Sequence, residues 1–263
     1  MYRHAIRAAL PFACLLLIAP ASWAQDGEVP SWADDLHLVM FGGPPAGHVE
    51  VQLNGEFVAE FVEGAPPTAE IADLLEPGVN ELTVSVTPDE GASSHPGPLR
   101  IAVSGIEKVS AYQSQALPPL AQIEVPPTLD GECAQTSRFW AGPTEARTEE
   151  LKKRYWLVVD GPPANHWFTV YLNDVPVYGA NSGDTFVEVT DHVKKGKNAV
   201  RFEGVKSCMH RETDQGDIFR IGIVLGSQEY DRVNVEGAPL AMFEYDPRTK
   251  KDEVSRKQSF RGY

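Results

Sequence analysis

One hairpin occurs twice in this chain, and that repetition restricts the folds open to it. The stretch VEVQLNGEFVAEF at 49–61 reads as a strand, a turn and a second strand, and FTVYLNDVPVYG at 168–179 repeats the pattern. Further segments match in the same order: 38–48 with 156–166, 70–86 with 188–204, and 99–103 with 219–223. This agreement of order and spacing indicates two copies of one domain that arose by internal duplication.

Each copy has the alternation of strands, because apolar residues recur at every second position. Examples from the first copy are Val49, Val51 and Leu53; Leu82, Val84 and Val86; and Leu99, Ile101 and Val103. A period of two with one apolar face predicts sheets buried on one side, which pack face to face in a domain of about 100 residues. We therefore predict an all-β chain with two tandem β-sandwich domains.

The repeated residues resemble those of the galactose-binding-like jelly-roll module that accompanies glycosidase catalytic domains. They are Leu53, Asn54, Gly55, Asp73, Leu75, Gly78, Asn80, Leu82 and Val84, echoed by Leu172, Asn173, Asp174, Asp191, Val193, Gly196, Asn198 and Val200. The resemblance implies a jelly-roll sandwich and, through the family, carbohydrate binding. Since these are turn and core positions, they speak for the fold more than for an activity, and an immunoglobulin-like sandwich stays open.

The domain boundaries are predicted from composition. We expect a signal peptide at 1–24, a first sandwich at 30–112, a proline-rich linker at 113–128, a second sandwich at 129–240 and a basic C-terminal tail at 241–263. Two proline pairs in the linker favour a semi-rigid spacer. The only helix candidate is 144–153, for which a charged loop is the alternative.

The N-terminus has the layout of a cleaved export signal. Arg3, His4 and Arg7 precede an apolar run at 8–18, and small residues end at Ala24. We expect cleavage after Ala24, a periplasmic or secreted product and no membrane insertion. Cleavage removes two cations and no acid, so the formal net charge of −14 becomes −16, which argues against nucleic acid as a partner.

Two cysteines stay after that cleavage, and an oxidising compartment favours their pairing. A disulfide between Cys133 and Cys208 is expected, with a redox or metal-binding thiol as the alternative. Both lie in the predicted second domain. The bridge is therefore expected to staple that domain internally.

Reaction chemistry has no recognisable motif in the sequence. Nucleophile elbows, zinc-binding helices, phosphate loops and calcium loops do not occur, so we expect no enzyme and no cofactor. A metal site is considered for a run of soft and acidic ligands, but not expected: Cys208, Met209, His210, Glu212, Asp214 and Asp217. A glycosidase-like or metal-dependent enzyme is the least favoured reading.

Two histidines follow the repeated Pro-Pro-Ala, His48 and His166. They are interpreted as hydrogen-bonding the backbone at a turn, with a ligand contact in each domain as the alternative. The copies differ more in aromatic residues. Trp167 and Tyr171 stand on the face where copy one has polar groups, and Trp140 is a further ring; a protein partner, a glycan, or packing inside the protein would each suit them.

The tail reverses the charge of the chain. From Tyr245 on, six basic residues stand against three acidic ones. Arg256 and Lys257, with Phe260 and Tyr263 as anchors, are candidates for partner binding, while a free or self-docked tail stays open. The sequence thus predicts an exported, non-catalytic binding or scaffold protein that docks an envelope protein, with polysaccharide recognition as the alternative.

Overall fold

The computed structural model describes residues 32–43, 47–61, 68–88, 98–110, 113–116, 119–127, 129, 131–143, 151–161, 165–180, 183, 185–209, 218–229 and 232–263. In these residues it holds eighteen β-strands, two short 3-10 helices and no α-helix. The predicted all-β sandwich character is therefore confirmed.

Nine strands form the first half of the molecule. They are β1 (Leu36–Gly42), β2 (Gly47–Leu53), β3 (Glu56–Phe61), β4 (Thr68–Glu70), β5 (Gly78–Pro88), β6 (Leu99–Ser110), β7 (Gln113–Ala116), β8 (Ala121–Val125) and β9 (Cys133–Ala141), with η1 (Ala72–Leu74) before β5. Strands β3-β2-β5-β9 form one sheet, and β8-β6-β1-β4 run side by side in the facing one.

The second half repeats this plan. Its strands are β10 (Tyr155–Asp160), β11 (His166–Leu172), β12 (Val175–Ala180), β13 (Thr185–Glu188), β14 (Gly196–Lys206), β15 (Phe219–Glu229), β16 (Arg232–Val235), β17 (Ala241–Tyr245) and β18 (Glu253–Gly262), with η2 (Thr190–His192) before β14. The orders β12-β11-β14-β18 and β13-β10-β15, with β17 also on β15, match those of the first half strand for strand. We call β3-β2-β5-β9 and β12-β11-β14-β18 the hairpin sheets.

The hairpin itself has the same irregularity in both halves. The β2–β3 register shifts between Val51 and Gln52, and the β11–β12 register shifts between Val170 and Tyr171. Counted from the turn, these are the same positions. The duplication stays an interpretation, and this shared bulge agrees with it.

The turn of each hairpin is held by a pair of asparagines, which we call the asparagine clasp. Asn54 has a φ of 53°, and its side chain donates to Asn80 Oδ1 at 2.8 Å and to the Leu74 carbonyl at 2.8 Å. Asn173, also at 53°, donates to Asn198 Oδ1 and to the His192 carbonyl, each at 2.9 Å. The repeated sequence motif is thus a turn with its backbone groups satisfied.

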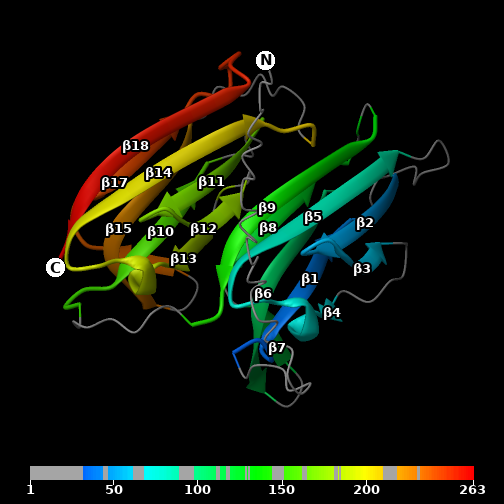
Figure 1. Ribbon diagram of the computed structural model, residues 1–263, viewed down its shortest axis with the longest axis horizontal. Coiled ribbons are helices and arrows are strands. Elements are labelled where there is room, and N and C mark those ends of the chain that lie inside the picture. Colours follow the sequence, from blue (N-terminus) through cyan, green and yellow to red (C-terminus); the bar gives the residue numbers. More distant parts are fainter. Residues whose placement is uncertain are drawn as a thin grey trace, which may run out of the picture.

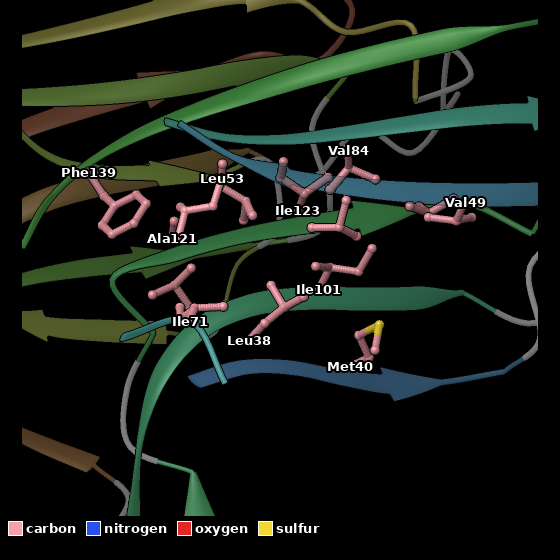
Figure 2. Packing of buried hydrophobic residues seen from close by; sticks show 14 of the residues in the cluster. Leu38, Met40, Val49, Leu53, Ile71, Val84, Ile101, Ala121, Ile123 and Phe139 are labelled. Atoms are coloured by element: carbon pink, nitrogen blue, oxygen red, sulfur yellow. The ribbon is translucent and has the colours of Figure 1, made fainter. Parts of the chain in front are cut away.

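Each half has its own apolar core between its two sheets. In the first, Leu38, Val49, Val84 and Ile101 are less than 2% exposed and face one another from four strands (Figure 2). The second core also lies between the two sheets of its half but contains more aromatic rings, with Phe168 stacked on Phe219 at 5.1 Å between centroids.

The two halves lie side by side, and the hairpin sheet of the second half continues into the first (Figure 1). A parallel pairing of Gly179 with Ala121 joins β12 to β8, so that one nine-stranded sheet runs through both halves. Strand β9 also lies along β12. We call this junction of β8 and β9 with β12 the seam.

The predicted linker is wrong, because the range 113–128 contains strands β7 and β8. Strand β8 pairs with β6 from Leu99↔Val125 to Val103↔Ala121. Its residues are all buried, and Ala121, Ile123 and Val125 belong to the first core. Pro126 and Pro127 follow this strand directly, where no ladder hydrogen bond is needed.

The boundaries at 129 and 241 are also corrected. Strand β9, expected to open the second domain, pairs with β5 of the first half from Val86↔Cys133 to Gly78↔Ala141. The expected free tail contains β17 and β18, and β18 pairs with β14 over ten positions. Because an edge strand with its side chains mostly exposed carries few apolar residues, its sequence resembles a polar tail.

Two expectations fall wholly or partly outside the described residues. The signal peptide 1–24 lies there, as does most of the helix candidate 144–153, whose last residues, 151–153, are not helical. Across the part of the chain that the structure describes, no helix has the length and apolar character needed to cross a bilayer.

Candidate functional site

The expected disulfide is present, but it joins the two halves. Cys133 lies at the start of β9 in the first half, and Cys208 follows β14 in the second, with an S–S distance of 2.01 Å. Next to it, Ser207 donates to Gln135 at 3.1 Å across the same seam. The expectation of a staple within one domain is wrong, because β9 belongs to the first half.

Trp167 is buried at the seam. Only 4% of it is exposed, and it packs into the core of the first half together with Met209. Gly179 makes this fit possible, since any side chain there would collide with Ser137 Oγ and come close to the Trp167 ring. Of the alternatives weighed for Trp167, packing inside the protein is the one observed.

Tyr171 stands on the outer face of the second hairpin sheet, in a row with two cations. The strand registers place Tyr171 opposite Arg201 and Arg201 opposite Lys257. The Arg201 guanidinium lies over the Tyr171 ring at 3.8 Å from its centroid. The same guanidinium also forms an ion pair with Glu203. We call Tyr171, Arg201 and Lys257 the cationic row. A cation–π contact of this kind fixes the direction of both side chains.

The row continues across the seam to Arg138 on β9. Arg138 pairs with Glu81 at 2.7 Å, and Glu81, with a smaller contribution from Tyr171, raises the pKa of the guanidinium. The halves thus contribute to one line of charged and aromatic groups, from Glu81 to Lys257. Such a line can recognise a carboxylate or another anionic group presented by a flat surface.

The first half has neutral residues at the corresponding positions. The matching registers place Gln52 opposite Thr83 and Thr83 opposite Thr136, with the two threonine hydroxyls 2.9 Å apart. This row of the first half is therefore polar and uncharged. Tyr171, Arg201 and Lys257 thus have no charged or aromatic counterparts at the matching positions of the first half.

Trp140 remains partly exposed on the outer face of the first half. Its Nε1 donates to the Gly142 carbonyl at 3.2 Å, and His192 approaches edge-on at 5.9 Å between ring centroids. Opposite it in register is Val79, which is 46% exposed. This ring is the one aromatic candidate on β9, and it lies beside the seam.

The four candidates in the predicted tail lie in different environments. Phe260 is 7% exposed and packs in the second core, so it is not available as an anchor. Tyr263 is 53% exposed, and Arg256 and Lys257 are exposed on β18. Within the described residues, neither Arg256 nor Lys257 has a carboxylate partner.

The two histidines do not occupy equivalent places. By register from the hairpin turn, His48 corresponds to Trp167, and it pairs with Glu60 at 3.1 Å on the surface. His166 is completely buried, with Nε2 at 2.7 Å from the Lys251 carbonyl and Nδ1 at 2.6 Å from the Tyr245 hydroxyl. A carbonyl only accepts, so Nε2 carries the proton, while the Tyr245 hydroxyl beside Nδ1 donates to Asn165 Oδ1 at 2.5 Å.

Burial determines the protonation states of His166 and Tyr245. It lowers the pKa of His166 and raises the pKa of Tyr245 to about 12, so both are neutral at physiological pH. The backbone hydrogen bond expected for a turn histidine therefore applies to His166 and ties β11 to the segment before β18.

Metal ligation finds no geometric support in the residues with a described position. No group of three or more His, Cys, Asp or Glu residues among them is arranged to hold an ion. Cys208 is bonded to Cys133, and the other candidate ligands, from His210 to Asp217, lie outside the described residues. The absence of a resident metal stays a prediction.

Sequence reasoning missed Arg138 and Arg201, the two guanidinium groups that flank Tyr171. Arg201 had a detectable signal, because it replaces Thr83 at the matching position of the repeat. Arg138 had none, since its neighbour Tyr171 comes from the other half. Comparison with protein families, with curated proteins and with solved structures finds no match for this chain.

Proposed function

We propose that this chain is an exported, non-catalytic binding or scaffold protein that docks an envelope protein through the cationic row. The observation that carries the proposal is the row itself, which places Tyr171, Arg201 and Lys257 where the first half has Gln52, Thr83 and Thr136. A partner with exposed carboxylates complements such a face.

Export rests on two features. The basic, apolar and small-residue order of 1–24 is that of a signal peptide, and the Cys133–Cys208 disulfide is compatible with an oxidising compartment. Periplasmic residence and full secretion both agree with them. The lack of a reaction motif in the sequence supports a binding role over catalysis.

A protein partner is favoured over a glycan because the Tyr171 ring already has a cation on one face. Sugar rings stack on open aromatic faces, and the Arg201 guanidinium covers this one at 3.8 Å. Trp167, the other ring considered for stacking, is buried. Arginine and tyrosine together are instead the side chains enriched where proteins meet.

The second candidate function, polysaccharide binding, rests on Trp140. This ring is half-buried on the outer face beside the exposed Val79. Titration with polysaccharides, followed by tryptophan emission, tests it. A saturable change that is lost in Trp140→Ala would support a glycan ligand, and an unchanged spectrum would remove this candidate.

The main test is capture of a partner from the envelope of the native host with the full-length chain as bait. We expect one stoichiometric protein, lost in the variant Lys257→Glu/Arg261→Glu, which reverses charge on the outer face of β18. The variant Lys250→Glu/Lys251→Glu is the matched control, because it makes the same charge change in exposed residues of the loop before β18.

The test uses point variants and does not delete the C-terminal segment, because that segment contains β18. Its deletion would uncover β14 and the second core, where Phe260 packs. Equal capture by the wild type and by Lys257→Glu/Arg261→Glu would show that the cationic row is not the docking face.

A further inference from the structure

At the seam, two kinds of sheet edge meet. We call the edge formed by the last strands of a half, β8 and β9 in the first half, its trailing edge, and the edge formed by the second hairpin strand, β12 in the second half, its leading edge. Strands β8 and β9 close the two sheets of the first half, and both lie against β12 of the second. Small residues meet at the point of closest pairing: Gly179 on β12 approaches Ser137 and the backbone of Arg138 on β9, and pairs with Ala121 on β8.

The same two kinds of edge occur again at the ends of the molecule. Strands β17 and β18 occupy the places of β8 and β9, and β3 occupies the place of β12. Among the described residues, β3 pairs only with β2, β17 only with β15 and β18 only with β14. In the described part of the chain, β3 of the first half is therefore a leading edge without a pairing partner beyond β2, and β17 and β18 of the second half form a trailing edge without one beyond β15 and β14.

The open edges carry opposite charges at positions where the seam is neutral. On the leading edge, Glu60 takes the place of Gly179, and Glu56 and Phe57 are exposed beside it, Phe57 to 59%. On the trailing edge, Arg256 takes the place of Gln135 and is exposed. An acidic strand with an apolar ring and a basic strand with open backbone groups are complementary.

We infer that a second copy of this chain occupies these edges, with β17 and β18 of one molecule against β3 of the next. The seam supplies the geometry, since a trailing edge already meets a leading edge there. In that arrangement Glu60 comes next to Gln258, the counterpart of Ser137, and within reach of Arg256 two residues away on the same strand.

The facing strands lie further apart in the intermolecular contact than at the seam. A side chain at Gly179 would collide with Ser137, so Glu60 keeps the two strands further apart. The contact is therefore made through side chains, reversible and sensitive to salt. Since the two edges differ, the contact is heterologous and builds open chains of molecules that do not stop at a dimer.

Sedimentation velocity over a concentration series of the exported full-length chain, with its disulfide formed, tests this inference. We expect a mass that grows continuously with concentration, and an association about tenfold weaker in about 0.5 M salt than in about 0.05 M salt. A chain that stays monomeric at every concentration, or one that stops at a dimer, overturns the inference.

Charge reversal identifies the two edges. Glu60→Arg blocks the leading edge and Arg256→Glu blocks the trailing edge, and each alone weakens association by about tenfold or more. An equimolar mixture of the two variants associates again into open alternating chains, because the two retained edges complement each other and the two reversed edges do so as well. The chain with both changes also associates again, with the charges exchanged. Association of either single variant at the wild-type strength, or no association in the mixture, overturns the proposed edges.

This inference is independent of the partner at the cationic row. Lys257→Glu/Arg261→Glu, the variant that tests the row, leaves Glu60 and Arg256 in place, and self-association is expected to persist in it. Glu60→Arg is expected to capture the envelope partner as the wild type does. Either proposal, self-association or partner binding at the cationic row, can therefore fail while the other holds.

Discussion

The two halves of this molecule are alike where the backbone needs support and different where surfaces meet. Both have the asparagine clasp, the same bulge and the same strand order. At the seam, however, Gly179 stands where the first half has Glu60, and in the cationic row Arg201 stands where it has Thr83. Turn and core positions fix the fold of a half, and its outer positions decide what it touches.

The largest expected effect comes from cutting the covalent link between the halves. Cys133→Ser/Cys208→Ser removes a bridge across 75 residues, which lowers the free energy of unfolding by about 4.5 kcal/mol on the chain-entropy estimate. Urea unfolding of the variant, with the reduced wild type as control, measures it. A midpoint equal to that of the oxidised wild type would show that the bridge adds nothing to the seam.

The likeness of the halves is tested by removing one clasp at a time. Asn80 and Asn198 are each completely buried, and each donates to two backbone carbonyls and accepts from one backbone N–H. Asn80→Ala and Asn198→Ala are each expected to cost about 3 kcal/mol, because buried polar groups lose their partners. Urea unfolding gives both values. Costs that differ by more than about 1.5 kcal/mol would mean that the clasps are not equivalent.

The difference between the halves is tested by an ion pair that recurs with different burial. Arg100 pairs with Glu124 at 2.8 Å, and that carboxylate is 9% exposed; Arg220 pairs with Glu244 at 3.2 Å, where the carboxylate is 57% exposed. Tyr178 of β12 lies near the first pair, since Arg100 acts on its pKa against the raising effect of burial.

Removal of each arginine should therefore have unequal results. Arg100→Ala leaves a buried carboxylate unpaired and is expected to cost about 2 kcal/mol, whereas Arg220→Ala is expected to cost about 0.5 kcal/mol or less. Thermal unfolding monitored by circular dichroism compares the two. Equal losses would contradict the view that the second half covers the trailing edge of the first.

The smallest expected effect is a pH dependence confined to the second half. Burial lowers the pKa of His166, so the unfolded chain binds this proton more readily than the folded protein. Stability from this group is present above the ordinary histidine pKa of about 6.5 and is lost as the pH falls below it. Urea midpoints at a series of pH values, compared with His166→Gln, isolate the contribution. A difference between the two proteins that does not change with pH would contradict it.

The local pattern of the sequence was sufficient for the core of each sandwich. Alternating apolar residues predicted β2, β5 and β6, and Asn54-Gly55 predicted the turn, where both residues have a positive φ. These features depend on neighbours in the chain and on one buried face.

Long-range pairing was beyond the same reasoning. Strand β9 carries the residues of a first-half strand but begins at a cysteine that bonds to the second half, and β18 buries few side chains. The burial of Trp167 depends on a surface supplied by the other half, which no pattern within 49–61 or 168–179 records. The burial of a residue at a junction is determined by the surface that it packs against, and that surface is supplied by a distant part of the chain.

The bridge across the seam also has a mechanical consequence. If tension acts on the two ends of the chain, as in a filament pulled along its length, the Cys133–Cys208 bond carries the force past the segment between them. Those 75 residues, with about 250 Å of extended length, cannot be drawn out while the bond is intact. Strands β9 to β14 are thereby shielded from stretching, and oxidation sets how far the molecule can lengthen before it breaks.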